Sequence, residues 1–290
     1  MVYGASTLKR RRATKAEMEE RARFLLDYAQ AHGPVTVRGL YYQATVAQVP
    51  GIEKVEAGYR RVQAQTLKLR RDHRMPYNVI ADATRYMRKP RSFDGWEDAL
   101  RATARTYRKA LWANSEVEVE IWLEKSALAG VLYPVTADFD VPLMPTGGQT
   151  SETFAFEAVE AMRGTGRRLV VYALYDFDAS GASARESLRE KVERFGREYR
   201  VPVEFHGLGL TLEQVRDMGL PTRPHKRNTA LDRKWPHDFA AELDAIPPDT
   251  LRAMVREAIE RHLPAHELKL LKQVEESERE LLLKFVEGAA

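Results

Sequence analysis

The sequence predicts an α/β protein in which a basic, winged helix-turn-helix domain precedes a domain with a mostly parallel sheet and C-terminal helices. Two observations predict this class. Residues 15–71 contain three segments with helical apolar periodicity, and the third is rich in Arg and Lys. Residues 117–208 alternate short apolar runs with helical segments, which is typical of parallel strands joined by helices. A length of 290 residues without an internal repeat fits two domains, which we place at 1–113 and 114–290.

The N-terminal part begins with the three helical segments. The first is amphipathic, spans residues 15–32 and stops before a Gly-Pro pair. Thr36 has the side chain of a helix N-cap and precedes the second segment. The third, about residues 53–71, has a basic face whose members are candidate DNA contacts: Arg60, Arg61, Lys68, Arg70 and Arg71. Residues 75–82 follow as a candidate wing strand, and in such folds the basic helix enters the major groove of DNA.

Charge is distributed unevenly along the chain. Residues 1–109 carry 23 Lys and Arg against 11 Asp and Glu, a net charge of +12, whereas the remainder carries 23 basic and 31 acidic residues, a net charge of −8. Arg-rich helices are often only solvated surfaces, but an excess this one-sided favours binding of a polyanion. We therefore expect double-stranded DNA as the partner.

The composition excludes several classes of site. The chain has no cysteine, which excludes disulfides, thiolate zinc sites and cysteine nucleophiles and leaves oxygen and imidazole ligands for any metal. It has no long apolar run and no recognisable signal peptide, so we expect a cytoplasmic, nucleoid-associated protein without a membrane span. The phosphate-binding sequence Gly-x-x-x-x-Gly-Lys-Ser/Thr does not occur, so ATP coupling would require a separate ATPase subunit.

One apolar run ends abruptly in two carboxylates. Residues 169–175 are too apolar for an edge strand, so a central parallel strand is predicted. Asp176 and Asp178 are two residues apart, so in an extended chain they point the same way while Phe177 points back into the protein. Two carboxylates at the carboxyl end of a parallel strand are suited to a hard divalent cation, Mg²⁺ or Mn²⁺. Asp, Ser and Gly are also the usual residues of a solvated turn, which is the alternative.

A second predicted strand, residues 117–123, also ends in an acid, Glu124. The 52 residues from Glu124 to Asp176 leave room for a helix, a short strand at 141–144 and another helix at 151–162. This order is a βαβαβ pattern, in which both strand ends lie at the same edge of the sheet. An alternative for Glu124 is an acid favoured by the dipole at a helix N-terminus.

Four further segments complete the middle of the chain. We predict a basic amphipathic helix at 94–112, a helix at 182–195 and a strand at 201–208. Residues 219–237 are dense in Pro, Arg, Lys and His and lack periodicity, so an extended loop is predicted. The basic residues of this loop are candidate phosphate contacts: Arg223, Lys226 and Arg227.

The C-terminal part contains another pair of acids and two helices. Glu242 and Asp244 are candidates for additional metal ligands or acid/base groups, on their chemistry alone. Helices are predicted at 248–262 and 264–286. Apolar residues of the last helix indicate packing or dimerisation: Leu268, Leu271, Val274, Leu281 and Phe285.

Two adjacent tyrosines in the second helical segment differ in their neighbours. Tyr41 shares the apolar face with Leu40 and Ala44, so it is predicted to belong to the core. Tyr42 shares a face with Arg38, one helical turn away. A tyrosine hydroxyl has a pKa of about 10 and needs a nearby cation or base to act as a nucleophile. Arg38 could bind a phosphate and stabilise the charge that develops on it.

The order of these motifs resembles a known family. Arg38-Gly-Leu-Tyr-Tyr42, a strand ending in Glu124, and Asp176-Phe-Asp178-x-x-Gly181 are together similar to the A subunit of type IIB topoisomerases (topoisomerase VI) and the related meiotic double-strand-break protein. More narrowly, the chain resembles their short stand-alone relatives, the mini-A type, and the resemblance spans roughly residues 20–200. One departure is Gly39, because the family usually has an acid after the arginine.

The resemblance implies a winged helix followed by a Toprim domain, a Rossmann-like fold that binds Mg²⁺. It makes Tyr42 the nucleophile that forms a phosphotyrosyl link to DNA and places Arg38 beside the scissile phosphate. Glu124, Asp176 and Asp178 become the metal ligands, with Glu124 also transferring protons to and from the leaving sugar oxygen. In the family a homodimer completes each site, so a homodimer is expected here.

Two other functions stay open at this point. In the first, the Toprim-like domain is a metal-dependent nuclease that uses water, and Tyr42 is structural. In the second, the protein is a non-catalytic DNA-binding subunit with a degenerate site.

Overall fold

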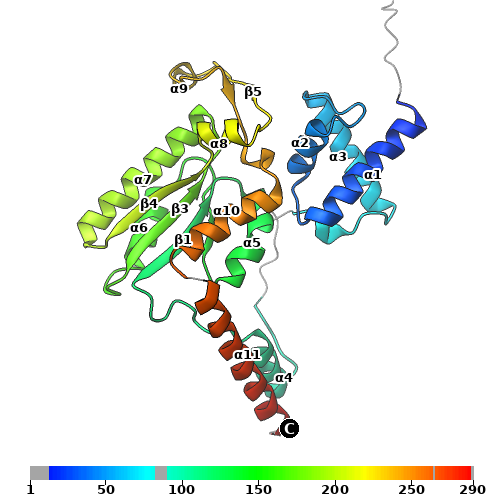
Figure 1. The fold of residues 1–290 in the computed structure, drawn as a ribbon. Coiled ribbons are helices and arrows are strands. Elements are labelled where there is room, and N and C mark those ends of the chain that lie inside the picture. Colours follow the sequence, from blue (N-terminus) through cyan, green and yellow to red (C-terminus); the bar gives the residue numbers. More distant parts are fainter. Residues whose placement is uncertain (1–12, 82–89, 264, 289–290) are drawn as a thin grey trace, which may run out of the picture. The chain divides into compact units, whose positions relative to one another are not determined.

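The structure is a computed structural model that describes residues 13–81, 90–263 and 265–288 (Figure 1). The chain divides into two compact units, Met1–Ile80 and Ala81–Ala290. This division lies earlier than the boundary expected near residue 114. Residues 1–80 carry 15 basic and 7 acidic residues, a net charge of +8, and the remainder carries 31 basic and 35 acidic residues, a net of −4. The positive excess of the first unit is therefore smaller than the sequence division suggested.

Three packed helices form the described core of the first unit: α1 (Lys15–His32), α2 (Val37–Val46) and α3 (Glu56–Arg71). Thr36 accepts a hydrogen bond from the backbone N–H of Gly39, so the predicted N-cap of α2 is confirmed. Each helix contributes fully buried apolar side chains to the core, among them Leu25, Leu40 and Leu69.

The candidate wing strand is wrong for residues 75–81, and Asp82 lies outside the described residues. Tyr77–Val79 forms a 3-10 turn, η1, and Ile80 makes an isolated parallel bridge with Val35. Met75 and Ile80 are both buried. An odd spacing puts two side chains on opposite faces of an extended strand, whereas the turn allows both to be buried.

The second unit contains a four-stranded sheet, and every strand pairs with its neighbours in parallel. The strand order is β2-β1-β3-β4, so the predicted α/β class with a parallel sheet is confirmed. The strands are β1 (Val117–Leu123), β2 (Leu143–Pro145), β3 (Arg168–Leu174) and β4 (Val203–Gly209). After Arg168, every residue of β3 is buried, as expected of a central strand.

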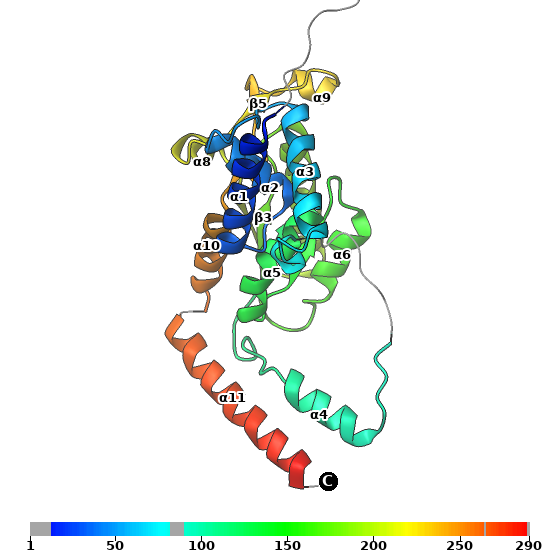
Figure 2. The same cartoon turned by 90° about the vertical axis from the view of Figure 1, so that its right-hand side faces the viewer.

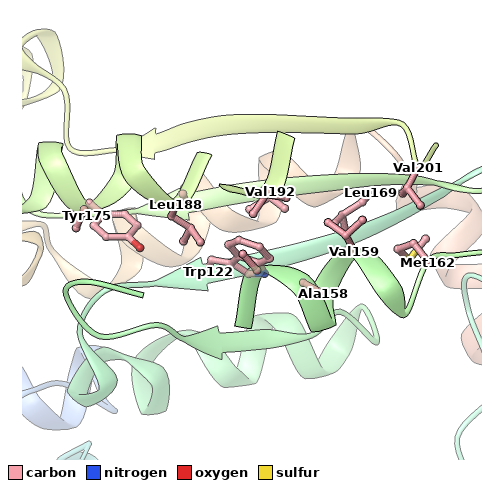
Figure 3. Close-up of a cluster of buried hydrophobic side chains, with 13 residues drawn as sticks. Trp122, Ala158, Val159, Met162, Leu169, Tyr175, Leu188, Val192 and Val201 are labelled. Carbon is pink, nitrogen blue, oxygen red and sulfur yellow. The ribbon is translucent and has the colours of Figure 1, made fainter. Parts of the chain in front are cut away.

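Helices cover both faces of this sheet (Figure 1). The pair on one face is α6 (Glu152–Glu160) and α7 (Ala179–Tyr199), and the pair on the other is α5 (Ala129–Asp138) and α10 (Pro248–Glu260). Trp122 lies in the core beneath α6 and α7 with Leu188 and Val192 (Figure 3).

The segment predicted as a loop at 219–237 contains regular structure. After α8 (Leu212–Asp217), β5 (Arg223–Pro224) pairs antiparallel with β6 (Phe239–Ala240), and α9 (Ala230–Arg233) lies between them. These elements are too short to produce a periodicity in the sequence, which is why they were missed.

Two helices of the second unit pack against each other away from the sheet: α4 (Trp96–Thr106) and α11 (Ala265–Gly288) (Figure 2). The helix predicted to reach residue 112 ends at Thr106. Beyond it, the backbone N–H of Lys109 donates to Glu275 at 2.9 Å, and Arg279 donates to the carbonyl of Tyr107 at 3.0 Å. These contacts with α11 replace the helical hydrogen bonds. Within the described ranges, no helix has the length and apolar content to cross a membrane.

Candidate functional site

The carboxyl ends of β1 and β3 bring the first two predicted acids together. Glu124 directly follows β1, and its backbone N–H donates to the carbonyl of Leu174 at 2.9 Å, which extends the pairing with β3. The backbone N–H of Asp176 donates to the Glu124 carboxylate at 2.8 Å. Acids 52 residues apart in sequence therefore lie side by side at one edge of the sheet.

A short antiparallel bridge brings in the other acid pair. Phe177 and Ala241 exchange both backbone hydrogen bonds, at 2.9 and 3.0 Å. Glu242 and Asp244 follow at once, and the backbone N–H of Leu243 donates to Asp176 at 2.8 Å. Phe177 itself is buried, as its alternation with the two aspartates predicted. The side chains of Glu242 and Asp244 are only 10% and 5% exposed.

Lys125 lies at the centre of these carboxylates. Its ammonium nitrogen is 2.9 Å from an oxygen of Asp176 and 3.0 Å from an oxygen of both Glu242 and Asp244. Sequence reasoning missed this residue. The available signal was its position: a lysine directly after a strand-terminal acid enters a buried, acidic edge where a cation is needed.

Arg223 binds the remaining predicted metal ligand. Its guanidinium is 2.8 Å from one oxygen of Asp178 and 3.6 Å from the oxygen of Glu242 that does not bind Lys125. The other oxygen of Asp178 accepts from the backbone N–H of Gly181 and caps α7. Asp178 therefore acts as a helix cap, close to the turn interpretation, and also as an ion-pair partner. Arg223, a candidate phosphate contact, pairs with two members of the acid cluster in the structure.

The acid cluster, defined as Glu124, Asp176, Asp178, Glu242 and Asp244, has more negative than positive charge. With Lys125 and Arg223 included, five carboxylates face two cations, a net charge of −3 when all are ionised.

This environment shifts the pKa values of Glu124, Asp176 and Lys125. Burial raises the pKa of Glu124 to about 7, and the charges of Asp176 and Asp178 act in the same direction. Burial also raises the pKa of Asp176, against the opposing effect of Lys125. For Lys125, burial lowers the pKa, but the carboxylates of Asp244, Asp176 and Glu242 outweigh burial and raise it. Lys125 is therefore a permanent cation at neutral pH.

The donor set fits a hard divalent cation. It consists of carboxylate oxygens, which Mg²⁺ and Mn²⁺ prefer, and it carries excess negative charge. Among residues 13–81, 90–263 and 265–288, however, no three His, Asp or Glu side chains form a ready-made coordination sphere. The acids are assembled around an ammonium group, at distances set by hydrogen bonds.

The predicted nucleophile lies in the first unit, on α2. Tyr41 and Tyr42 are each 5% exposed, so exposure does not separate a core tyrosine from a reactive one. Their rings are 5.3 Å apart, and the Tyr41 ring is 5.5 Å from that of Tyr59. The guanidinium of Arg38 stacks on Tyr59 at 4.5 Å. Tyr59 thus contacts both Arg38 and Tyr41.

The candidate DNA contacts on α3 differ in how firmly they are held. Arg60 pairs with Glu56, one turn away, and Arg61 pairs with Glu53. Arg70 is half-buried and stacks on Tyr77 at 4.3 Å. The remaining candidates in the chain are exposed: Lys68, Arg71, Lys226 and Arg227, the last of which pairs with Asp238.

No protein-family model matches the sequence, and a search of curated proteins also finds no match. Function is therefore inferred from the chemistry of the acid cluster and of α2.

Proposed function

We propose that the protein is a Mg²⁺-dependent DNA strand-cleaving enzyme of the topoisomerase VI A-subunit type, which works through a phosphotyrosyl intermediate. The observation that carries the proposal is the convergence of Glu124 and Asp176 at the carboxyl edge of the parallel sheet, with three further carboxylates beside them. This edge is where open α/β sheets bind their ligands.

In this reaction the hydroxyl oxygen of Tyr42 attacks a backbone phosphorus atom, forms a P–O bond and releases its proton to water. The bond between phosphorus and the leaving sugar oxygen breaks, and that oxygen takes a proton from Glu124. A pKa of about 7 suits Glu124 to give and regain this proton near neutral pH. Arg38 binds the phosphate. Religation reverses the steps. A divalent cation held by the acid cluster would orient the phosphate and stabilise developing negative charge.

The proposal includes double-stranded DNA and a second copy of the chain. The net charge of +8 on residues 1–80 supports binding of DNA. A homodimer would bring Tyr42 of one copy to the acid cluster of the other, as in the family that the sequence resembles. Exposed apolar side chains on α11 are consistent with a partner surface: Leu270, Val274, Leu281 and Phe285. ATP coupling would come from a separate subunit.

One observation favours the alternative of a water-using nuclease. Tyr42 is 5% exposed, whereas a nucleophile must reach its phosphate. The acid cluster would then activate water, and Tyr42 would stabilise the fold. A different observation favours a non-catalytic DNA-binding subunit, because Lys125 and Arg223 already neutralise part of the cluster.

The test is denaturant trapping of covalent protein–DNA adducts on supercoiled plasmid with Mg²⁺ or Mn²⁺. We expect adducts from the wild-type chain and from Tyr41→Phe, and none from Tyr42→Phe. Tyr41 is a matched control because it neighbours Tyr42 and has the same exposure. Metal-dependent nicking without adducts that survives in Tyr42→Phe would establish the nuclease instead. DNA binding without nicking, unaltered in Asp176→Ala, would leave the non-catalytic subunit.

A further inference from the structure

Lys125 occupies the position that a cation would take among three of the acids. We call Asp176, Glu242 and Asp244 the ammonium pocket, because one oxygen of each lies 2.9–3.0 Å from the Lys125 nitrogen. An ammonium group has three N–H donors, so all three can be used here. The pocket is thus saturated by a cation that belongs to the chain.

The ammonium pocket differs from the metal ligands that the sequence resemblance implies. Those are Glu124, Asp176 and Asp178. In the structure, Asp178 is engaged by the cap of α7 and by Arg223. Glu124 accepts from the backbone N–H of Asp176. The Lys125 nitrogen, by contrast, has three carboxylate oxygens within 3.0 Å.

The geometry of the pocket distinguishes an ammonium from a divalent cation. Oxygen ligands lie about 2.0–2.1 Å from Mg²⁺. The three oxygens around Lys125 are almost 1 Å farther from the centre. A divalent cation could therefore enter only after the ammonium leaves and the carboxylates close in. The four-carbon stem of Lys125 gives it a way out, because its side chain remains 25% exposed.

We propose that Lys125 is a tethered competitor for the divalent cation: it keeps the ammonium pocket assembled, and a metal ion loads there by displacing its ammonium group. The metal requirement itself belongs to the proposed function, on which this inference rests. Removing the lysine charge leaves three carboxylates that repel one another. Such a chain gains more from a divalent cation than the wild type, in which the cation must first expel an ammonium.

Arg223 is not displaced together with Lys125. It binds Glu242 through the oxygen that Lys125 does not use, and it also holds Asp178. It can therefore remain in place when Lys125 leaves. We expect a single displacing ion per chain, with ligands from Asp176, Glu242 and Asp244.

The test measures binding of Mn²⁺ to the full chain, without DNA, from the electron paramagnetic resonance signal of the free ion. Lys125→Met removes the charge, Lys125→Arg keeps it, and Lys234→Met is the matched control at an exposed lysine. We expect Lys125→Met to bind Mn²⁺ at least tenfold more tightly than the wild type. Lys125→Arg should bind no more tightly than the wild type, and Lys234→Met should equal it. Equal or weaker binding by Lys125→Met overturns the inference.

Thermal unfolding with and without Mn²⁺ covers a variant that folds poorly. We expect Lys125→Met and Lys125→Gln to have lower midpoints than the wild type without metal, and Mn²⁺ to raise their midpoints more than it raises that of the wild type. If both neutral variants remain unfolded with Mn²⁺ present, the metal cannot replace the ammonium and the inference is wrong. Asp244→Asn should weaken Mn²⁺ binding, and unchanged binding in this variant contradicts the assigned ligands.

Plasmid nicking by the same preparations separates this inference from the proposed function. Tighter Mn²⁺ binding by Lys125→Met, with no DNA cleavage by the wild type, leaves the competitor role standing and removes the enzyme. Mg²⁺-dependent cleavage by the wild type, with unchanged Mn²⁺ affinity in Lys125→Met, supports the proposed enzyme and overturns the competitor role of Lys125.

Discussion

The charged residues of α3 and those of the acid cluster are held in opposite ways. On α3, Arg60 is paired with Glu56 one helical turn away, and both side chains are at least two-thirds exposed. In the acid cluster, Lys125 is paired with Asp244, 119 residues away, and the aspartate is 5% exposed. Water solvates the first pair with or without its partner, whereas the second pair has little access to water. The charged residues of α3 therefore contribute little to the stability of the first unit, whereas those of the acid cluster contribute to the stability of the second.

The largest effect expected from this comparison is at Asp244. Asp244→Ala leaves one N–H of the Lys125 ammonium without its acceptor, and a charged donor left unsatisfied in a buried site costs about 3 kcal/mol. We expect urea denaturation to show that loss in the free energy of unfolding of the second unit. Glu56→Ala on α3 should leave the unfolding transition unchanged. Similar losses from both variants would show that the two regions do not differ as described.

A second buried acid tests, through the pH dependence of stability, whether buried charged groups affect the free energy of unfolding. Glu120, on β1, accepts from the indole N–H of Trp122 at 2.6 Å, and burial raises its pKa to about 7, with Glu118 acting in the same direction. Below the unfolded pKa the group is protonated in both states. As pH rises towards 7, only the folded state resists ionisation, so stability is lost over that interval.

Glu120→Gln removes this loss, since an amide oxygen can still accept from Trp122. We expect the variant to be more stable than the wild type by up to about 3 kcal/mol at pH 8, from 1.36 kcal/mol per pKa unit. At pH 4 this pH-dependent advantage should be absent. Chemical denaturation at the two pH values measures the difference, and an advantage that is independent of pH would contradict the raised pKa.

An intermediate effect is expected where the first unit depends on a local contact. Thr36→Ala removes the buried hydroxyl that caps α2. The loss should be about 1 kcal/mol, the usual value of an N-cap. Thr36→Ser, which keeps the hydroxyl, should retain most of the stability. Thermal unfolding of both variants checks this, and equal losses would show that the methyl group matters rather than the cap.

The smallest effect on stability is expected at the exposed basic residues. Lys68→Ala and Arg71→Ala should leave the unfolding midpoint unchanged, because both side chains are exposed. Each should weaken binding to duplex DNA a few-fold and lower the salt dependence of the affinity by about one unit of slope per phosphate contact. Fluorescence anisotropy at several salt concentrations measures both quantities. An unchanged salt slope would show that α3 does not face the phosphates.

Much of the secondary structure could be predicted because it depends on neighbours in sequence. Apolar periodicity located the three helices of the first unit and the central strand β3, and the hydroxyl of Thr36 marked a helix start. The prediction was wrong where a distant contact overrides the local pattern. The helix expected to reach residue 112 ends at Thr106 because α11 takes over its backbone partners.

The positions of Glu124 and Asp176 at the ends of two parallel strands follow from the local sequence, because strand polarity fixes both acids at one edge of the sheet. The partners of these acids depend on contacts between segments far apart in the chain. The bridge between Phe177 and Ala241 brings in Glu242 and Asp244, and Lys125 turns towards them. Buried charges must be neutralised by whatever residues the fold brings within about 3 Å. The apolar periodicity of the sequence does not indicate which residues neutralise these buried charges.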